Sequence, residues 1–77
     1  MSGLRQIHWK EFEKFLIVVG CVFVREKGDH RIWKRPGLKR PIVLPRSNPL
    51  PIFVIRNNLW LLEISADEYL RIMERKQ

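Results

Sequence analysis

The chain has 77 residues and carries 15 Lys and Arg against 8 Asp and Glu, which gives a net charge of +7. A chain of this length is expected to form a single small domain over residues 1–77. A single cysteine, Cys21, cannot form an intrachain disulfide. One cysteine and two histidines are also too few ligands for a structural zinc site, which takes four. The longest apolar run, Phe15 to Val19, is too short to span a bilayer, and no secretion signal is recognisable, so we expect a cytoplasmic protein.

The positive charge is concentrated in the middle of the chain. Eight basic residues and two acidic residues lie between Arg25 and Arg46, which accounts for six of the seven net charges. A localised basic field attracts polyanions. The charge therefore favours contact with nucleic acid, and the alternative is a solvated basic surface with no specific partner.

The first predicted element is a helix from about Trp9 to Val19. Gly20 follows it at the position where a helix C-cap prefers glycine. His8 precedes it and is expected to be a poor N-cap and a solvated surface residue. The helix is predicted because its apolar residues recur at spacings of three and four, namely Trp9, Phe12, Phe15, Leu16 and Val19.

Three short strands are predicted next, at Cys21–Arg25, His30–Arg35 and Pro41–Leu44. Turns at Lys27-Gly28-Asp29 and Pro36-Gly37 join them, which predicts an antiparallel meander. Pro41 favours an edge position for the third strand. Cys21, which begins an apolar strand, is interpreted as a buried packing residue.

The rest of the chain is predicted to be helical. After a breaker loop, Asn48 can cap a helix, and Pro51 is tolerated in a first helical turn. A core face follows on Ile52, Ile55, Leu59 and Leu62. Ser65 to Glu68 form a capping-box pattern, which predicts a short last helix starting near Ala66.

This order predicts an α+β fold of the type α-β-β-β-α, with a three-stranded antiparallel sheet, helices on one face and a short C-terminal helix. The same order occurs in double-stranded-RNA-binding domains. Fold-level likeness does not establish function.

His30 is the strongest candidate for chemistry, because it stands where the Gly28-Asp29 turn becomes a strand and projects at the rim of the sheet. Imidazole exchanges protons near neutral pH. RNA cleavage needs a base for the ribose 2′-hydroxyl, cations for the charged phosphorane and an acid for the leaving 5′-oxygen. The alternative is a solvated histidine. Glu26 and Asp29 could hold Mg²⁺, but they are interpreted as solvated partners of basic residues.

Four segments of the chain, in this order, resemble the HicA (YcfA-like) toxin family. The longest is Val19 to Pro36, in which Arg25-Glu26-Lys27-Gly28-Asp29-His30 resembles the family's Arg-x-Lys-Gly-Ser-His. The others are Leu44-Pro45-Arg46, Ile55-Arg56-Asn57-Asn58-Leu59 and Ser65-Ala66-Asp67-Glu68-Tyr69-Leu70. The resemblance covers about residues 9–70.

The resemblance implies an mRNA-cleaving toxin of a type II toxin–antitoxin pair, inhibited by an acidic HicB-type antitoxin. It implies a fold like that of double-stranded-RNA-binding domains and places the catalytic histidine at His30. We expect the reaction to need neither a metal ion nor a cofactor. The alternative function is a non-catalytic RNA-binding module. Asp29 replaces the family's usual serine, Arg46 begins the segment where the family often has a second histidine, and no glycine is present near Glu63 between the last two helices.

Two further groups of residues are predicted to bind ligands. Strand alternation puts Arg31, Trp33 and Arg35 on one side of the second strand and His30, Ile32 and Lys34 on the other. Trp33 could stack on an unpaired base or pack against the protein. Ile17 and Val18 lie off the core face of the first helix and are predicted to bind the antitoxin. The predicted RNA-binding residues are Lys27, Gly28, Arg31, Lys34, Arg35, Lys39 and Arg40.

Overall fold

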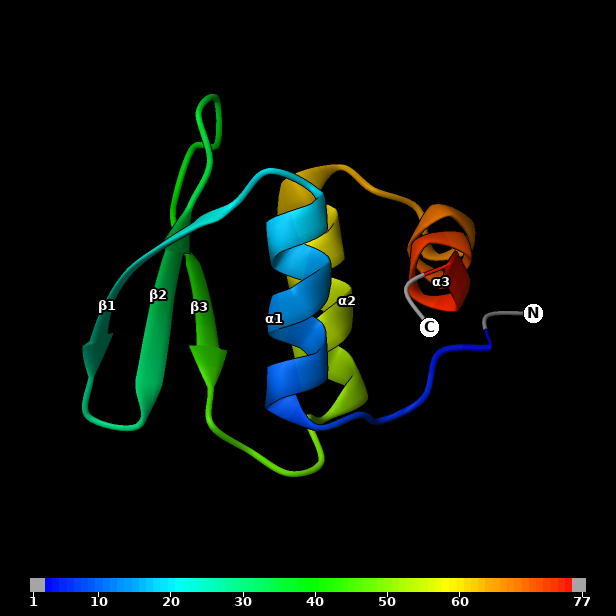
Figure 1. The fold of residues 1–77 in the computed structure, drawn as a ribbon, viewed down its shortest axis with the longest axis horizontal. Helices are drawn as coiled ribbons and strands as arrows, with labels where there is room; N and C mark the ends of the chain where they lie inside the picture. The colour runs from blue at the N-terminus through cyan, green and yellow to red at the C-terminus, as the bar shows by residue number, and fades with distance from the viewer. Residues whose placement is uncertain (1–2, 76–77) are drawn as a thin grey trace.

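The computed structural model describes residues 3–75 and has an α+β architecture. Helices α1 and α2 cover one face of a three-stranded antiparallel sheet, and α3 packs on the side of these helices away from the sheet (Figure 1). The predicted α-β-β-β-α order with an added C-terminal helix is confirmed. The elements are α1 (Trp9–Val18), β1 (Val22–Lys27), β2 (His30–Lys34), β3 (Ile42–Pro45), α2 (Ile52–Leu62) and α3 (Ala66–Arg75).

Helix α1 begins at a cap that the sequence analysis did not expect. The His8 side chain accepts a hydrogen bond from the backbone N–H of Lys10 through Nδ1, at 3.1 Å. The prediction that His8 is a poor cap is therefore wrong, because an unprotonated ring nitrogen can accept this bond as a serine oxygen does. At the other end, Gly20 has a φ of 92° and its N–H donates to the carbonyl of Ile17. This is the predicted glycine stop.

The sheet has the order β1-β2-β3, so β3 is an edge strand, as Pro41 predicted. The strands begin and end within one or two residues of the predicted bounds. Between β1 and β2, Gly28 takes a φ of 61° at the first position of a two-residue turn. Between β2 and β3, the N–H of Leu38 donates to the carbonyl of Arg35, across a turn in which Gly37 has a φ of 91°.

The start of α2 differs from the prediction, whereas the start of α3 confirms it. The N-cap of α2 is Pro51, so Asn48 lies three residues too early to cap the helix. Glu63 ends α2 in the left-handed conformation, with φ 58° and ψ 40°. At α3, the Ser65 hydroxyl accepts a hydrogen bond from the N–H of Glu68, as the capping-box pattern predicted.

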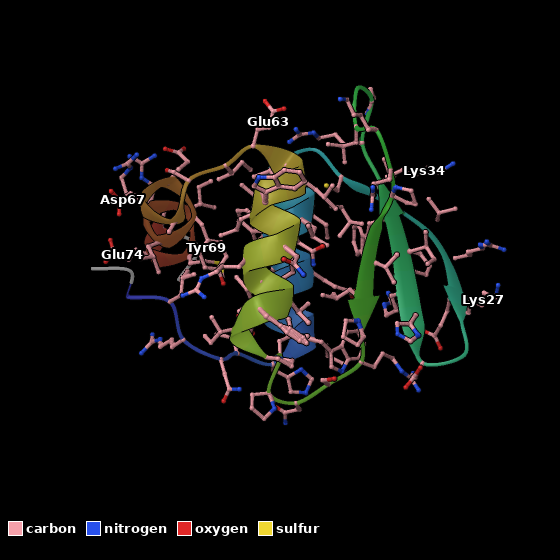
Figure 2. All side chains as sticks on the ribbon, turned by 180° about the vertical axis from the view of Figure 1, so that it is seen from behind. Lys27, Lys34, Glu63, Asp67, Tyr69 and Glu74 are labelled. Carbon is pink, nitrogen blue, oxygen red and sulfur yellow. The ribbon has the colours of Figure 1, made fainter. Side chains whose placement is uncertain are left out.

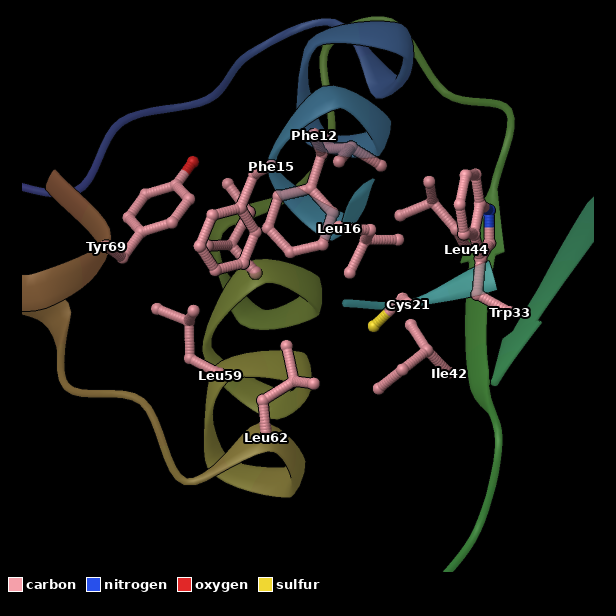
Figure 3. Packing of buried hydrophobic residues seen from close by; sticks show 12 residues of the cluster. Phe12, Phe15, Leu16, Cys21, Trp33, Ile42, Leu44, Leu59, Leu62 and Tyr69 are labelled. Atoms are coloured by element: carbon pink, nitrogen blue, oxygen red, sulfur yellow. The ribbon is translucent and has the colours of Figure 1, made fainter. Parts of the chain in front are cut away.

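The core lies between the sheet and the helices and continues between the helices and α3 (Figure 3). The ring of Phe15 meets the ring of Tyr69 edge to face, with centroids 4.8 Å apart, which joins α3 to α1. No helix within residues 3–75 has the length and apolar character needed to cross a membrane. The fully or nearly buried apolar residues include Phe12, Phe15, Leu16, Cys21, Trp33, Ile42, Leu44, Ile55, Leu59, Leu62 and Tyr69.

Candidate functional site

His30 is the first residue of β2 and its side chain is half exposed. Its Nδ1 lies 3.1 Å from Oδ1 of Asp29. The other ring nitrogen, Nε2, has no partner within residues 3–75. A carboxylate that holds an imidazole at Nδ1 leaves Nε2 free to exchange a proton with a bound molecule. Asp29 thus occupies the position from which it can orient His30.

The turn that carries Asp29 and His30 is fixed to the segment after β3. The backbone N–H of Arg46 donates to the carbonyl of Asp29 at 2.9 Å, and His30 stands opposite Pro45 in the sheet. Nη1 of Arg46 lies 3.4 Å from Oε2 of Glu26. The segment where the family often has a second histidine is therefore bonded to this turn through its backbone, and the Arg46 guanidinium pairs with Glu26.

Gly28 is needed in this turn for its backbone conformation and not for lack of space. Its φ is 61°, and a Cβ atom built there would meet nothing within 4 Å. Open space in front of a turn lets a large ligand approach the backbone closely. The site thus opens to solvent beside His30.

The outer face of the sheet, away from the helices, carries His30 together with basic side chains. Lys27 stands directly opposite His30 in the antiparallel register, and Lys34 stands opposite Val22. Lys27 and Lys34 are exposed, and in Figure 2 they extend from the side of the sheet away from the helices. Lys39 and Arg40 are also exposed, in the connection from β2 to β3.

The other side of β2 faces the helices, which confirms the predicted alternation. Arg31 is bonded through Nε to the carboxylate of Glu13 in α1, and its Nη1 lies 2.9 Å from Oε1 of Glu26. Its guanidinium also lies over the ring of Phe23, 4.2 Å from the centroid. The hydrogen bond with Glu13 raises the pKa of Arg31. Two carboxylates and an aromatic ring therefore engage this predicted RNA-binding residue.

Arg35 and Trp33 also make contacts within the fold. Arg35 donates to the carbonyl of Val19 at 3.1 Å and to the carbonyl of Leu62 at 3.4 Å, so it joins the ends of α1 and α2. Trp33 is 4% exposed, and its indole N–H donates to Glu13 at 2.9 Å. Of the two interpretations of Trp33, the structure favours packing.

Cys21 is a packing residue, and the two candidate metal-binding carboxylates are each paired with neighbouring side chains. Burial raises the pKa of the Cys21 thiol, and the nearby Arg35 offsets part of this effect. Cys21 is 6% exposed, which confirms the packing prediction. Glu26 pairs with Arg31 and Arg46, and Asp29 lies beside His30. Residues 3–75 contain no cluster of three or more His, Cys, Asp or Glu side chains suited to a metal ion.

The predicted antitoxin-binding residues are exposed. Ile17 and Val18 are 61% and 56% exposed at the end of α1, and Val22 at the start of β1 is 61% exposed. A group of exposed aliphatic side chains on a small domain is typical of a contact surface. We call Ile17, Val18 and Val22 the α1–β1 patch.

The structure also shows a groove that the sequence analysis did not identify. It lies between β3 and α2 and has a volume of about 590 Å³. Phe53 and Trp60 lie outside the core face predicted for α2, and nothing in the sequence placed them in one groove with His30. The groove is lined by His30, Arg40, Pro41, Val43, Pro45, Phe53, Val54, Asn57, Asn58, Trp60 and Leu61.

The fold and the site define a small α+β domain whose sheet presents a histidine among basic side chains at a fixed turn. The family model described as "HicA toxin of bacterial toxin-antitoxin" matches residues 9–60, more than half of the chain. The chain therefore belongs to the HicA toxin family, the toxins of bacterial toxin–antitoxin systems. No significant match was found among curated proteins or among solved structures.

Proposed function

We propose that this toxin is an endoribonuclease that cleaves mRNA without a metal ion, with His30 as its acid and base. The observation that supports this most directly is the half-exposed His30 at a fixed turn, with Nδ1 beside Asp29 and Nε2 open to a ligand. The basic outer face around it is suited to the phosphate backbone of RNA.

In the proposed reaction, Nε2 of His30 takes the proton from a ribose 2′-hydroxyl. The 2′-oxygen then bonds to the adjacent phosphorus, the bond from phosphorus to the 5′-oxygen breaks, and the leaving oxygen takes a proton from His30 or from water. Asp29 holds the imidazole ring during these transfers. Lys27, which stands opposite His30 in the sheet, stabilises the extra negative charge of the phosphorane.

We assign the phosphate contacts along the RNA to those predicted RNA-binding residues that are exposed to solvent. Lys27, Lys34, Lys39, Arg40 and the open turn at Gly28 meet this condition. Arg31 and Arg35 were predicted to bind RNA, and we propose that they contribute by holding the sheet against the helices, because their side chains are engaged there. Replacing one of the exposed lysines by alanine should weaken RNA binding for all sequences and reduce its salt dependence by roughly one phosphate contact.

The antitoxin is proposed to be an acidic HicB-type protein that uses the α1–β1 patch as its apolar anchor. Charge complementarity with the basic outer face speeds association, and buried apolar contacts slow dissociation. The double variant Ile17→Asp with Val18→Asp should therefore weaken inhibition by the antitoxin and leave RNA cleavage unchanged. A pull-down in which the double variant retains parental antitoxin binding would move the interface to another surface.

The catalytic assignment is tested with purified protein and RNA in the presence of EDTA. His30→Ala should reduce cleavage by roughly 10²- to 10⁴-fold, the usual effect of losing a general base. The matched control is His8→Ser, which keeps a capping oxygen at the start of α1 and leaves His30 as the only histidine. We expect this variant to cleave RNA at the parental rate.

If His30→Ala cleaves RNA as fast as the parental protein, His30 is not the catalytic residue. If the parental protein binds RNA but never cleaves it, with or without EDTA, the alternative of a non-catalytic RNA-binding module is correct.

A further inference from the structure

The groove between β3 and α2 adjoins the candidate catalytic site. The strand β3 runs toward the end of the molecule where α2 begins, and α2 returns alongside it in the opposite direction (Figure 1). Phe53, in the first turn of α2, therefore lies at the end of the groove with Pro45 and His30. Trp60, near the end of α2, lies at the end with Arg40. The groove volume of about 590 Å³ is within the range of about 300–1,000 Å³ that is usual for small-ligand sites.

Two aromatic side chains in this groove are exposed to an unusual degree. Phe53 is 56% exposed and Trp60 is 78% exposed, although burial of either ring would stabilise the domain. Asn57 lies between them on the same exposed stripe of α2, at helical spacings of four and three residues. The two rings are separated by roughly 10 Å along the helix axis, so they contact successive groups of a ligand and not the same one.

Asn58 adds a polar group that the fold does not use. Its side chain lines the groove and is 4% exposed. Its Nδ2 atom is buried and has no hydrogen-bond partner within the part of the chain that the structure describes. A buried donor without a partner lowers stability, and such groups are rare in proteins, where protein atoms, water, an ion or a ligand usually pair with them.

The charges of the groove favour an anion over an acidic or neutral peptide segment. Its lining includes His30 and Arg40 but no aspartate or glutamate. Aromatic faces, side-chain amides and cations without carboxylates are the combination that binds unpaired nucleotides. The faces stack on bases, the amides bond to base edges, and the cations meet phosphates.

We propose that the groove between β3 and α2 binds unpaired nucleotides of the RNA next to the bond that is cleaved, and selects among bases there. One base stacks on Phe53 beside His30, and a base further along the strand stacks on Trp60. Asn58 lines the groove, and a rotation of its side chain brings the buried amide N–H to the edge of the base on Phe53. This inference rests on the proposed function only in taking RNA as the ligand, and it does not require His30 to be catalytic.

The test uses the full chain and a short 2′-O-methyl oligoribonucleotide of mixed sequence, which lacks the attacking hydroxyl and cannot be cleaved by any residue. Binding is measured by fluorescence polarisation of the labelled oligonucleotide, and a duplex of the same length is compared with it. We expect preference for the unpaired strand, and Phe53→Ala should weaken its binding by roughly 5- to 150-fold, the usual effect of losing one stacked base. Phe53→Tyr keeps the aromatic face and should restore binding.

Tryptophan fluorescence gives a second readout. Trp60 is far more exposed than Trp33, so stacking should quench the Trp60 emission, and Trp60→Phe should remove the quenching while binding remains. The matched control Ile17→Ala removes an apolar side chain of similar exposure from the α1–β1 patch and should leave oligonucleotide binding unchanged. Circular dichroism checks that each variant is folded.

Asn58→Leu tests the base contact separately. The variant removes a buried amide that lacks a partner, so its melting temperature should equal or exceed that of the parental protein. Its affinities for oligonucleotides that differ in a single base should become more nearly equal. A parental degree of discrimination in Asn58→Leu would remove Asn58 from base recognition.

Parental affinity of Phe53→Ala for the unpaired oligonucleotide would overturn the proposal. The proposal would also be overturned if a groove variant such as Phe53→Ala bound RNA normally but no longer bound the antitoxin, because the groove would then be a protein-docking site. If the parental protein binds neither RNA form, both this inference and the proposed function fail. If the groove variants behave as expected but His30→Ala still cleaves RNA, only the catalytic assignment fails.

Discussion

Ionisation of Tyr69 should destabilise the protein at high pH by an amount that the structure defines. Tyr69 is the only tyrosine in the chain and is 2% exposed. It lies in α3 against the rings of Phe12 and Phe15 of α1, with centroids 5.9 Å and 4.8 Å away. Burial raises the pKa of the Tyr69 hydroxyl from 10.0 to about 12, with a smaller opposing effect of Arg5. The perturbation is therefore a titration from neutral to strongly alkaline pH.

The sign and size of this destabilisation follow from the difference between the Tyr69 pKa in the folded protein and its pKa in the unfolded chain. Between pH 10 and about 12, the unfolded chain has lost the Tyr69 proton while the folded chain still holds it. The free energy of unfolding therefore falls as pH rises through this interval and levels off above it. A difference of about two pKa units corresponds to a loss of about 2–3 kcal/mol, which is a large part of the stability of a domain of this size.

The assay is urea denaturation at a series of pH values for the parental protein and for Tyr69→Phe. Deprotonation of lysines affects both proteins alike, so the difference between the two curves isolates Tyr69. Tyrosinate absorbance of the folded parental protein gives the pKa directly, because no other tyrosine contributes. A folded-state pKa near 10, or identical alkaline slopes in the two proteins, would refute the reasoning.

Three further substitutions should change stability in defined directions, measured by thermal denaturation. Glu13→Ala removes the acceptor of the Trp33 indole and of a guanidinium, and should cost about 2–4 kcal/mol, whereas Glu11→Ala on the exposed side of α1 should cost less than about 1 kcal/mol. Equal effects of these two variants would contradict the structure. Gly28→Ala should cost about 1–2 kcal/mol through its positive φ alone, because the space around it is open. Glu63→Gly should stabilise by about 1 kcal/mol, or roughly 4–8 °C, because Glu63 occupies a left-handed position, and an unchanged melting temperature would show that this conformation carries no cost.

Local sequence patterns predicted most of the elements, because helical spacing, turn glycines and the Ser65 cap act within a few residues. The predictions of the two helix N-caps, at His8 and Asn48, were wrong. His8 was expected to be a weak cap, yet its ring nitrogen accepts the bond, and Asn48 was expected to cap a helix that begins after Pro51. The strand bounds also shifted by one or two residues, since they depend on pairing between strands and not on composition alone.

The candidate site was predictable where it depends on residues that are close together in the sequence. His30 and the Gly28 turn form one continuous segment, so their juxtaposition follows from the hairpin. The partners of Arg31 could not be predicted, because Glu13 comes from α1, 18 residues earlier in the chain. The groove depends on how α2 lies along β3, which is a tertiary contact, and the unpaired amide of Asn58 becomes visible only when all neighbouring side chains are placed.

The alternation of β2 has a consequence for how this toxin can diverge. Arg31, Trp33 and Arg35 hold the sheet to the helices, whereas Ile32 and Lys34 between them point to the outer face. Under the proposed function, substitutions at Ile32 and Lys34 can therefore change the RNA-binding face at little cost to folding. Insertion or deletion of one residue in β2 would turn the helix-facing side chains to the outer face and the outer side chains to the helices. Both faces of the strand would be lost together. If RNA binds as proposed, new substrate preferences should thus arise in this strand by substitution, and changes of length should fall in the connection between β2 and β3.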